Sequence, residues 1–357
     1  MIAAALDNPR WIEEAVQRPD SRATEAALER QQQLTKPAGS LGRLEAVAVQ
    51  LAGMQGCSKP QIERLNVTVF AADHGIAADG VSAYPQEVTA QMVANFASGG
   101  AAVTVLARHL GAEFEVVNLG TVAKVPVSEG VIDRMIAPAT ANFCQQQAMT
   151  TIQLQQALAV GAERIDRLAG QRPDLFIAGE MGIGNTSAAT AIAAALMQRK
   201  ALELTGPGTG LNRLQIQSKA QKIQQAIDLH AVAADRPLEA LSRMGGFEIA
   251  AMVGAYLRCG QQAIPVLVDG FISSVAALVA CLLQPDLRSW MLFGHQSAEP
   301  GHRLVLEALD AEPLLQLDMR LGEGSGAVLA VDLLRAACRL HAEMATFAEA
   351  GVSDRAE

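Results

Sequence analysis

A glycine-rich turn, GEMGIGNT at residues 179–186, joins a short apolar run to an alanine-rich helical stretch. The apolar run is Leu175–Ala178 and the helical stretch covers 187–196. A strand, a glycine loop and a helix start bring backbone N–H groups close to a bound anion, and the helix N-terminus adds partial positive charge. No lysine follows the last glycine and the G-x-G-x-x-G spacing is absent, so neither a Walker A loop nor a dinucleotide turn is predicted. The loop instead carries a carboxylate, Glu180, which indicates chemistry beside a phosphate; a tight turn without a ligand is the alternative.

Short apolar runs alternate with helical patterns from about residue 60 onward. Helical periodicity covers 88–109 and 249–262, among other stretches. Such alternation is typical of parallel βαβ units, so the chain is predicted to be an α/β protein with a doubly wound, mostly parallel sheet. The strands are expected at 67–71, 114–117, 175–178, 265–268 and 290–293.

The five apolar runs share a feature at their ends. Each leads into a glycine and a polar residue, and ligands of open α/β sheets bind at the carboxyl ends of the strands. One composite site is therefore predicted there. The ends are Asp73-His74-Gly75, Asn118-Leu119-Gly120, Gly179-Glu180, Asp269-Gly270 and Gly294-His295.

Composition limits the partners and the compartment. Half of the 357 residues are hydrophobic, the formal net charge is -9 and basic residues are scattered, which argues against nucleic acid. Five cysteines without a C-x-x-C favour reduced thiols and a cytoplasmic location. The start, Met1–Asp7, lacks the features of a signal peptide. The longest apolar stretch, 263–283, is broken by Pro265 and Asp269, so a buried strand and helix are expected there and no membrane span.

Three more groups extend the candidate phosphate site. A second glycine loop, GPGTG, occupies 206–210, and Lys219 lies on the helix after it. Ser297 follows the last apolar run. Backbone donors, one ammonium group and a hydroxyl together could hold a phosphate, although a solvated helix lysine is an equally open interpretation of Lys219.

Glu323 lies between two glycines at the mouth of an apolar helix, 327–344. Burial would raise the pKa of this carboxyl group toward neutrality and make it a general base. The alternative is an acid that only stabilises the helix N-terminus. His74, His295 and His302 show no spacing of a metal site, and no nucleophile elbow occurs. The paired aspartates of diphosphate-dependent phosphoribosyltransferases are also missing, so neither a metal nor a cofactor is predicted.

Taken together, the motifs resemble the nicotinate-nucleotide–dimethylbenzimidazole phosphoribosyltransferase family, which acts late in cobalamin synthesis. The resemblance runs almost from end to end and rests on six stretches in the family's order. They are KPAGSLGRLE at 36–45, ADHG at 72–75, GEMGIGNT at 179–186, GGFE at 245–248, VDGF at 268–271 and RLGEGSGA at 320–327.

The resemblance implies a reaction, an architecture and a set of roles. The 5-phosphoribosyl group of nicotinate mononucleotide would move to 5,6-dimethylbenzimidazole, giving α-ribazole 5′-phosphate and nicotinate with inversion at C1′. A homodimer is implied, with a large Rossmann-like domain at 60–310 and a small helical domain built from 1–59 and 311–357. Glu323 matches the catalytic glutamate and Glu180 a second, supporting acid. Nucleotide contacts are implied for Gly182, Asn185, Thr186, Gly206, Gly208, Lys219 and Ser297.

The base pocket is where the chain departs from some members of the family. Tyr84 and Met92 stand at positions that look like pocket-lining ones, where others carry smaller or more polar residues. The preferred base is therefore open, and adenine or a phenolic acceptor is an alternative to dimethylbenzimidazole. A non-catalytic nucleotide-binding module is a second alternative, and a dehydrogenase is disfavoured by the absent dinucleotide fingerprint.

Overall fold

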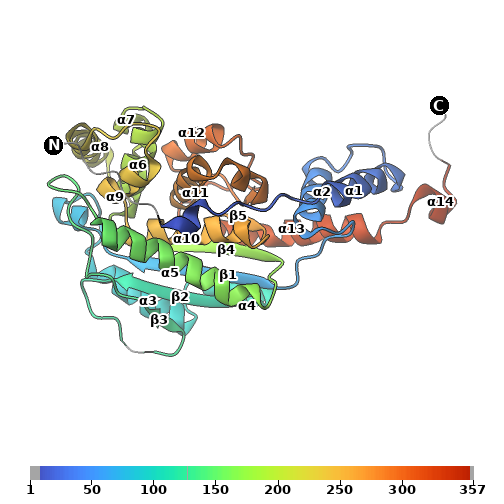
Figure 1. The fold of residues 1–357 in the computed structure, drawn as a ribbon, viewed down its shortest axis with the longest axis horizontal. Helices are drawn as coiled ribbons and strands as arrows, with labels where there is room; N and C mark the ends of the chain where they lie inside the picture. The colour runs from blue at the N-terminus through green and yellow to red at the C-terminus, as the bar shows by residue number, and fades with distance from the viewer. Residues whose placement is uncertain (1–8, 127, 354–357) are drawn as a thin grey trace.

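A six-stranded sheet in which every neighbouring pair is parallel forms the centre of the computed structural model, which describes residues 9–126 and 128–353 (Figure 1). The strand order is β3-β2-β1-β4-β5-β6, so the chain winds outward from β1 in one direction and from β4 in the other. The doubly wound, mostly parallel α/β sheet is thereby confirmed. The strands are β1 (Leu65–Ala72), β2 (Glu113–Gly120), β3 (Val131–Asp133), β4 (Leu175–Met181), β5 (Val266–Val268) and β6 (Met291–Phe293).

Helices cover both faces of the sheet, which explains why all eight residues of β1 are buried. α3, α4 and α13 pack on one face, and α10 and α11 pack on the other, with α5 along α10, as expected for the right-handed crossovers that parallel strands favour. The α-helices are α1 (Ser21–Gln33), α2 (Arg43–Gln55), α3 (Glu87–Ser98), α4 (Ala102–Leu110), α5 (Thr151–Ala169), α6 (Asn185–Leu196), α7 (Ala201–Leu204), α8 (Arg213–His230), α9 (Pro237–Met244), α10 (Phe247–Gln261), α11 (Phe271–Leu283), α12 (Pro300–Ala308), α13 (Ser325–Glu343) and α14 (Phe347–Ala350). Three short 3₁₀ helices are η1 (Arg10–Glu13), η2 (Gly75–Asp79) and η3 (Pro285–Trp290).

The helix expected over 88–109 is wrong in one respect, because the structure divides it into α3 and α4. Gly99 ends α3 in the left-handed conformation, with φ of 78°, which a residue with a side chain rarely adopts. By length and composition, the segment Glu87–Leu110 is the one stretch of the described residues that could cross a membrane. The division leaves helices of 12 and 9 residues, each shorter than the ~20 residues that a span needs. The apolar stretch 263–283 forms β5 and α11, as expected.

α5 and α10 approach each other closely because each presents a glycine to the other. A Cβ at Gly161 would lie 1.8 Å from the carbonyl oxygen of Ala251, and one at Gly254 would lie 2.0 Å from that of Leu158. The pair is also tied to the sheet, since Arg164 on α5 forms an ion pair with Glu115 on β2 at 2.6 Å. This contact fixes the helix layer that lies over β1 and β4.

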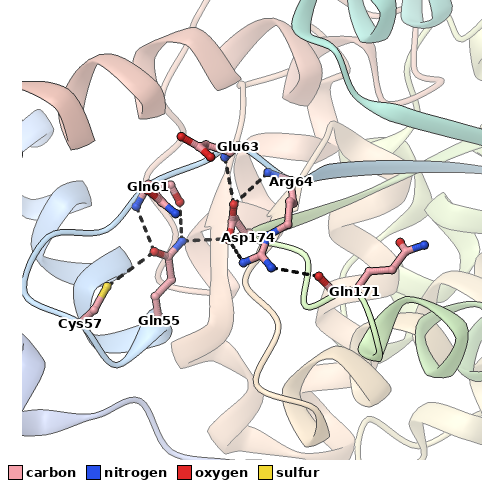
Figure 2. A network of polar contacts seen from close by, with 7 residues as sticks. All are labelled: Gln55, Cys57, Gln61, Glu63, Arg64, Gln171 and Asp174. Carbon is pink, nitrogen blue, oxygen red and sulfur yellow. Dashed lines mark hydrogen bonds and ion pairs between the residues drawn. The ribbon is translucent and has the colours of Figure 1, made fainter.

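A polar network joins the amino ends of β1 and β4 to the end of α2 (Figure 2). The Asp174 carboxylate accepts the backbone N–H of Glu63 at 3.0 Å and that of Arg64 at 2.9 Å, and it pairs with the Arg64 guanidinium at 2.7 Å. Gln55 Nε2 donates to the carbonyl of Gln61 at 2.7 Å. The network lies at the amino ends of the strands, on the opposite side of the sheet from the carboxyl ends that carry the candidate site. It holds the two central strands in register.

Helices from the first and last parts of the chain, α1, α2, α14 and the second half of α13, meet in a helical extension (Figure 1), whereas η1 before them packs near the end of α10. Arg30 on α1 donates to the carbonyls of His341, Ala342 and Met344 at 2.7 to 3.1 Å. α2 nevertheless contributes Val47 and other side chains to the same continuous core as the sheet. The boundaries at 60 and 310 stay a prediction, and Met1–Asp7 lies outside the described residues.

Candidate active site

A cavity of about 280 Å³ opens at the carboxyl ends of β4, β5 and β6. Strands from one half of the sheet therefore supply its floor, and the loops after them supply its walls, as expected for a doubly wound sheet. The lining residues are Tyr84, Glu180, Met181, Gly182, Ile183, Asn185, Thr186, Gly208, Thr209, Asp269, Gly270, Phe271, Ile272, Ser273, His295, Ser297, Glu299, Arg320, Leu321, Gly322 and Glu323.

Three of the five strand ends reach this cavity, so the prediction of one site shared by all five is only partly right. Glu180, Asp269 and His295 follow or end β4, β5 and β6 and line the cavity. The end of β2 instead makes contacts within the sheet. Asn118 Oδ1 accepts the N–H of Gly120 at 3.1 Å, and Asn118 Nδ2 donates to the Asp133 carboxylate on β3 at 3.2 Å.

The end of β1 acts behind the cavity, where it holds the first glycine loop. Asp73 accepts the hydroxyl of Thr89 at 2.6 Å, and that hydroxyl in turn accepts the N–H of Ile183 at 3.1 Å. His74 is fully buried and its Nε2 lies 2.7 Å from Glu248 in the GGFE stretch. His74 therefore takes part in a buried hydrogen bond behind the cavity. Within residues 9–126 and 128–353, no three His, Cys, Asp or Glu side chains are arranged to hold a metal ion.

Glu180 is the penultimate residue of β4, and its carboxylate is buried under the Glu323 loop. Asn185 Nδ2 donates to Glu180 Oε2, and the backbone N–H of Glu323 donates to the same carboxylate. Burial raises the pKa of Glu180 well above its usual range, and the nearby carboxylates of Glu248 and Asp269 act in the same direction. This rise favours the neutral form of Glu180, which would support the loop without adding a second full negative charge.

Glu323 has an unusual backbone and an unusual environment. It has φ of 65° between Gly322 at 83° and Gly324 at 86°, so three successive residues adopt the left-handed region. A side chain there is uncommon and costs free energy, which marks the residue as functionally constrained. Glu323 is 6% exposed, and burial, with Asp269 nearby, raises the pKa of its carboxyl group to about 7. Such a group can accept a proton near neutral pH.

Asp269 and two histidines lie beside the Glu323 loop. The Asp269 carboxylate accepts the N–H of Ala327 at 2.7 Å and that of Gly324 at 3.2 Å, and it lies 3.7 Å from His295 Nε2. His302 Nδ1 accepts the N–H of Ser297 at 2.7 Å. Burial lowers the pKa of His302 to about 3, so this ring is neutral and orders the Ser297 loop.

The Lys219 ammonium and the Thr186 hydroxyl, which we call the donor group, lie at the wall formed by the second glycine loop and α8. Lys219 is 2% exposed, and its Nζ donates to the hydroxyl of Thr186 at 2.8 Å. Burial lowers the pKa of Lys219 to about 8, against the opposing effect of the Glu299 carboxylate. Glu299 accepts the N–H of Gly208 at 3.0 Å. The interpretation of Lys219 as a solvated helix lysine is therefore excluded.

The second loop needs glycine at Gly206 because of close packing, and at Gly208 because of its backbone conformation. A Cβ at Gly206 would lie 2.0 Å from Glu299 Oε2, and Gly208 has φ of 51°. Arg320 donates from Nη1 to the Gly208 carbonyl at 3.0 Å and so ties this loop to the stretch that carries Glu323.

Most, but not all, of the predicted site residues meet at the cavity. Tyr84 lines it and is 55% exposed, whereas Met92 packs against the core near Asn95 and does not line it. Gly206 and Lys219 lie directly behind the wall. The predicted residues on the cavity are Tyr84, Glu180, Gly182, Asn185, Thr186, Gly208, Ser297 and Glu323.

Sequence reasoning assigned no role to Asp269, Glu299 or Arg320, which all line the cavity. Asp269 follows a predicted strand. A buried aspartate at such a place needs N–H partners, so its position alone indicates a hydrogen-bonding role. Arg320 opens the RLGEGSGA stretch but its partner Gly208 lies 112 residues away, and Glu299 stands in no motif, with its partner 91 residues away.

Comparisons with known proteins agree over nearly the whole chain. A family model described as phosphoribosyltransferase matches residues 16–352. The nicotinate-nucleotide–dimethylbenzimidazole phosphoribosyltransferase of Pseudomonas putida strain W619 is 57% identical over 348 residues, which are 98% of this chain and 99% of that protein. The enzyme of the same name from Xanthomonas oryzae pv. oryzae strain PXO99A is 58% identical over 344 residues, 96% of this chain and 99% of that protein.

A solved structure shows the same arrangement of elements. The crystal structure of nicotinate-nucleotide–dimethylbenzimidazole phosphoribosyltransferase from Thermus thermophilus superposes with a TM-score of 0.88 at 44% identity. The match covers 94% of this chain and 100% of that one.

Proposed function

The chain belongs to the nicotinate-nucleotide–dimethylbenzimidazole phosphoribosyltransferase family, and from this membership we propose that it transfers the 5-phosphoribosyl group of nicotinate mononucleotide to 5,6-dimethylbenzimidazole. The products are α-ribazole 5′-phosphate and nicotinate. The observation that carries the proposal is the buried Glu323 carboxyl group, which lines the cavity with a pKa of about 7. A binding module would gain nothing from such a group, because a carboxylate near a phosphate weakens binding.

The chemistry needs a proton acceptor at the attacking base. In nicotinate mononucleotide the ring nitrogen bonded to C1′ is cationic, so the bond breaks with its electron pair going to the departing nicotinate. One benzimidazole nitrogen forms the new bond to C1′ from the opposite face, which inverts the configuration. The proton on the other benzimidazole nitrogen becomes acidic as this bond forms, and Glu323 accepts it. General base catalysis of this kind contributes ~10²–10⁴-fold to the rate.

The donor group suits the 5′-phosphate. Lys219 and the Thr186 hydroxyl supply one charge and one polar contact, and the N-terminus of α6 supplies backbone N–H groups. Glu180 supports the Glu323 loop beside them. Holding the phosphate fixes the sugar against the attacking base, which is the usual use of a remote anchor.

The test compares wild-type protein with Glu323→Gln in a product assay that contains nicotinate mononucleotide, dimethylbenzimidazole and a chelator. We expect nicotinate and α-ribazole phosphate from the wild type, and a kcat at least ~10²-fold lower in the variant with little change in nucleotide affinity. Glu307→Gln is the matched control, since its side chain is 55% exposed on α12. Wild-type turnover in Glu323→Gln would remove this residue from the role of base.

The exposed ring of Tyr84 leaves open which base is the preferred acceptor. This aromatic side chain on the cavity can stack on another ring, so adenine or a phenolic acceptor is the runner-up substrate. A competition assay with equimolar bases decides between them by product ratio. Nucleotide binding without product from any base would instead favour a non-catalytic module.

The assembly state and location belong to the same proposal. The relatives' family implies a homodimer, which sedimentation equilibrium would detect as a mass twice the 37.5 kDa of one chain. A cytoplasmic location fits the five free thiols.

A further inference from the structure

We propose that Asp269 is a positioning residue for Glu323: its buried carboxylate holds the loop Gly322–Gly324 so that the Glu323 side chain faces the cavity. The inference rests on the proposed role of Glu323 as the base. It concerns the residue after β5, to which neither the sequence motifs nor the comparisons assign a function.

The contacts of Asp269 converge on one short segment. Oδ2 accepts the N–H of Gly324 at 3.2 Å, Oδ1 accepts the N–H of Ala327 at 2.7 Å, and the N–H of Gly326 also donates to the carboxylate. Asp269 is 1% exposed and lies in the strand-to-helix turn that ends β5. Three N–H groups from the start of α13 are therefore gathered by one side chain from a different element.

The loop needs such a hold because its backbone is strained. Glu323 stands at φ 65° between two left-handed glycines, a conformation that persists only where the surroundings impose it. Packing closes the remaining sides: a Cβ at Gly179 would lie 2.2 Å from the Glu323 carbonyl, and one at Gly326 would lie 2.0 Å from the His295 ring. Asp269 supplies the hydrogen bonds that this packing cannot.

Asp269 also acts on Glu323 through its charge. The titratable groups that line the cavity with Glu323 are Tyr84 before α3, Glu180 from β4, Asp269 after β5, His295 after β6, and Glu299 and Arg320 on the loops. Burial raises the pKa of Glu323 first, and the charge of Asp269 raises it further. Burial raises the pKa of Asp269, and His295 and the three N–H donors oppose this rise by favouring the charged form. Positioning and charge thus come from the same carboxylate.

The experiment measures kcat, KM for nicotinate mononucleotide and the pH profile of kcat/KM in four proteins beside the wild type. Asp269→Asn and Asp269→Ser remove the charge but keep an oxygen acceptor of the kind that suits a helix N-terminus. Gly324→Ala strains the loop and leaves the charge, because its φ is 86° and the new Cβ would lie 3.3 Å from Gly179 Cα. Asp286→Asn changes an aspartate that is 62% exposed on η3 and serves as the control.

For the Asp269 variants we expect kcat to fall at least ~10-fold, since a misplacement of about 1 Å can cost ~10²-fold, with KM changed less than about threefold. The acid limb of the profile should move to lower pH, because Glu323 loses a negative neighbour. Comparison with the wild type cancels the titration of the substrates. Gly324→Ala should lower kcat and leave the limb in place, and Asp286→Asn should match the wild type.

Two outcomes would overturn the inference. The first is an unmoved acid limb in a folded Asp269 variant, which would make the residue a helix cap only. The second is failure of both Asp269 variants to fold, which would make its role structural. Failure of the proposed function looks different, because the wild type itself would then form no product, or Glu323→Gln would keep full activity.

Discussion

At the scale of single residues, one residue that lines the cavity is costly to stability in two ways. Its carboxyl group is buried, and its backbone adopts the left-handed conformation. Glu323 is 6% exposed and has φ of 65°. Both features reduce stability, as expected where a protein gives up stability for the catalytic role proposed for this residue. The consequence is measurable as a dependence of stability on pH.

Glu323→Gln should stabilise the protein more at pH 8 than at pH 5. The folded-state pKa of about 7 lies above the usual 4.5, so folding favours the protonated form. The stability from this group is fully present below pH 4.5 and is lost as the pH rises through 7. A neutral Gln avoids that loss, on the order of 1–3 kcal/mol. Urea unfolding at both pH values checks this, with Glu307→Gln as the control; an equal effect of Glu323→Gln at both pH values would contradict it.

Lys219→Met should raise KM for the nucleotide ~10- to 100-fold and affect kcat less, since a hydrogen bond to a charged group contributes about 1.5–3 kcal/mol. The pKa of Lys219 near 8 also means that wild-type affinity for the nucleotide should fall above that pH, as the ammonium loses its proton. Steady-state kinetics from pH 6 to 9 measures both effects. Lys222→Met, also on α8 and bonded to the Asp79 carbonyl, is the control. An unchanged KM in a folded Lys219→Met variant would show that Lys219 does not hold the phosphate of the nucleotide.

The residue scale also shows the limits of sequence reasoning. Glycine spacing and family resemblance located Glu180 and Glu323, because both stand in short local motifs. Local sequence could not decide whether Lys219 is buried or solvated, since its burial depends on Thr186, 33 residues away. The contribution of Asp269 likewise depends on N–H groups from α13, which only the folded chain brings together.

At the scale of elements, the buried strands were predictable, the short β5 and β6 included, whereas the partly exposed β3 and the boundary between α3 and α4 were not. β3 has three residues, none of them fully buried, and so lacks an apolar run. The division between α3 and α4 was missed because their apolar pattern continues across Gly99. Both errors arise where a local pattern is weak and tertiary contacts decide.

Gly254→Ala should separate α5 from α10 and lower the free energy of unfolding by about 1–3 kcal/mol, the usual cost of overpacking. The new Cβ would lie 2.0 Å from the Leu158 carbonyl oxygen, on a backbone that cannot move alone. Gly170→Ala is the matched control at the end of α5, where nothing lies within 4 Å of a Cβ. Urea denaturation measures both, and a Gly254→Ala protein as stable as Gly170→Ala would refute the close contact.

At the scale of the whole molecule, the chain ends are held to each other by a few polar contacts, whereas the sheet is held by a continuous core. Arg30→Met should remove the three carbonyl contacts at the end of α13 and cost about 1–3 kcal/mol locally. Native-state hydrogen exchange should become faster in α1 and α14, while amides of β1 and β4 keep their protection. Arg22→Met, on the exposed side of α1, is the control. Equal acceleration in the sheet would show that the extension and the sheet open as one unit.

The order of the cavity residues along the chain has an evolutionary consequence. Among the described residues, Tyr84 is the one cavity-lining side chain that precedes Glu180, and the rest fall between Glu180 and Glu323. Recombination between related genes upstream of β4 would therefore replace the aromatic wall, together with Asp73 and Thr89 behind the first glycine loop, and leave the acids and both glycine loops on one segment. On the proposed role of Tyr84, exchange of this one segment would change the preferred base and leave the acids of the proposed reaction in place.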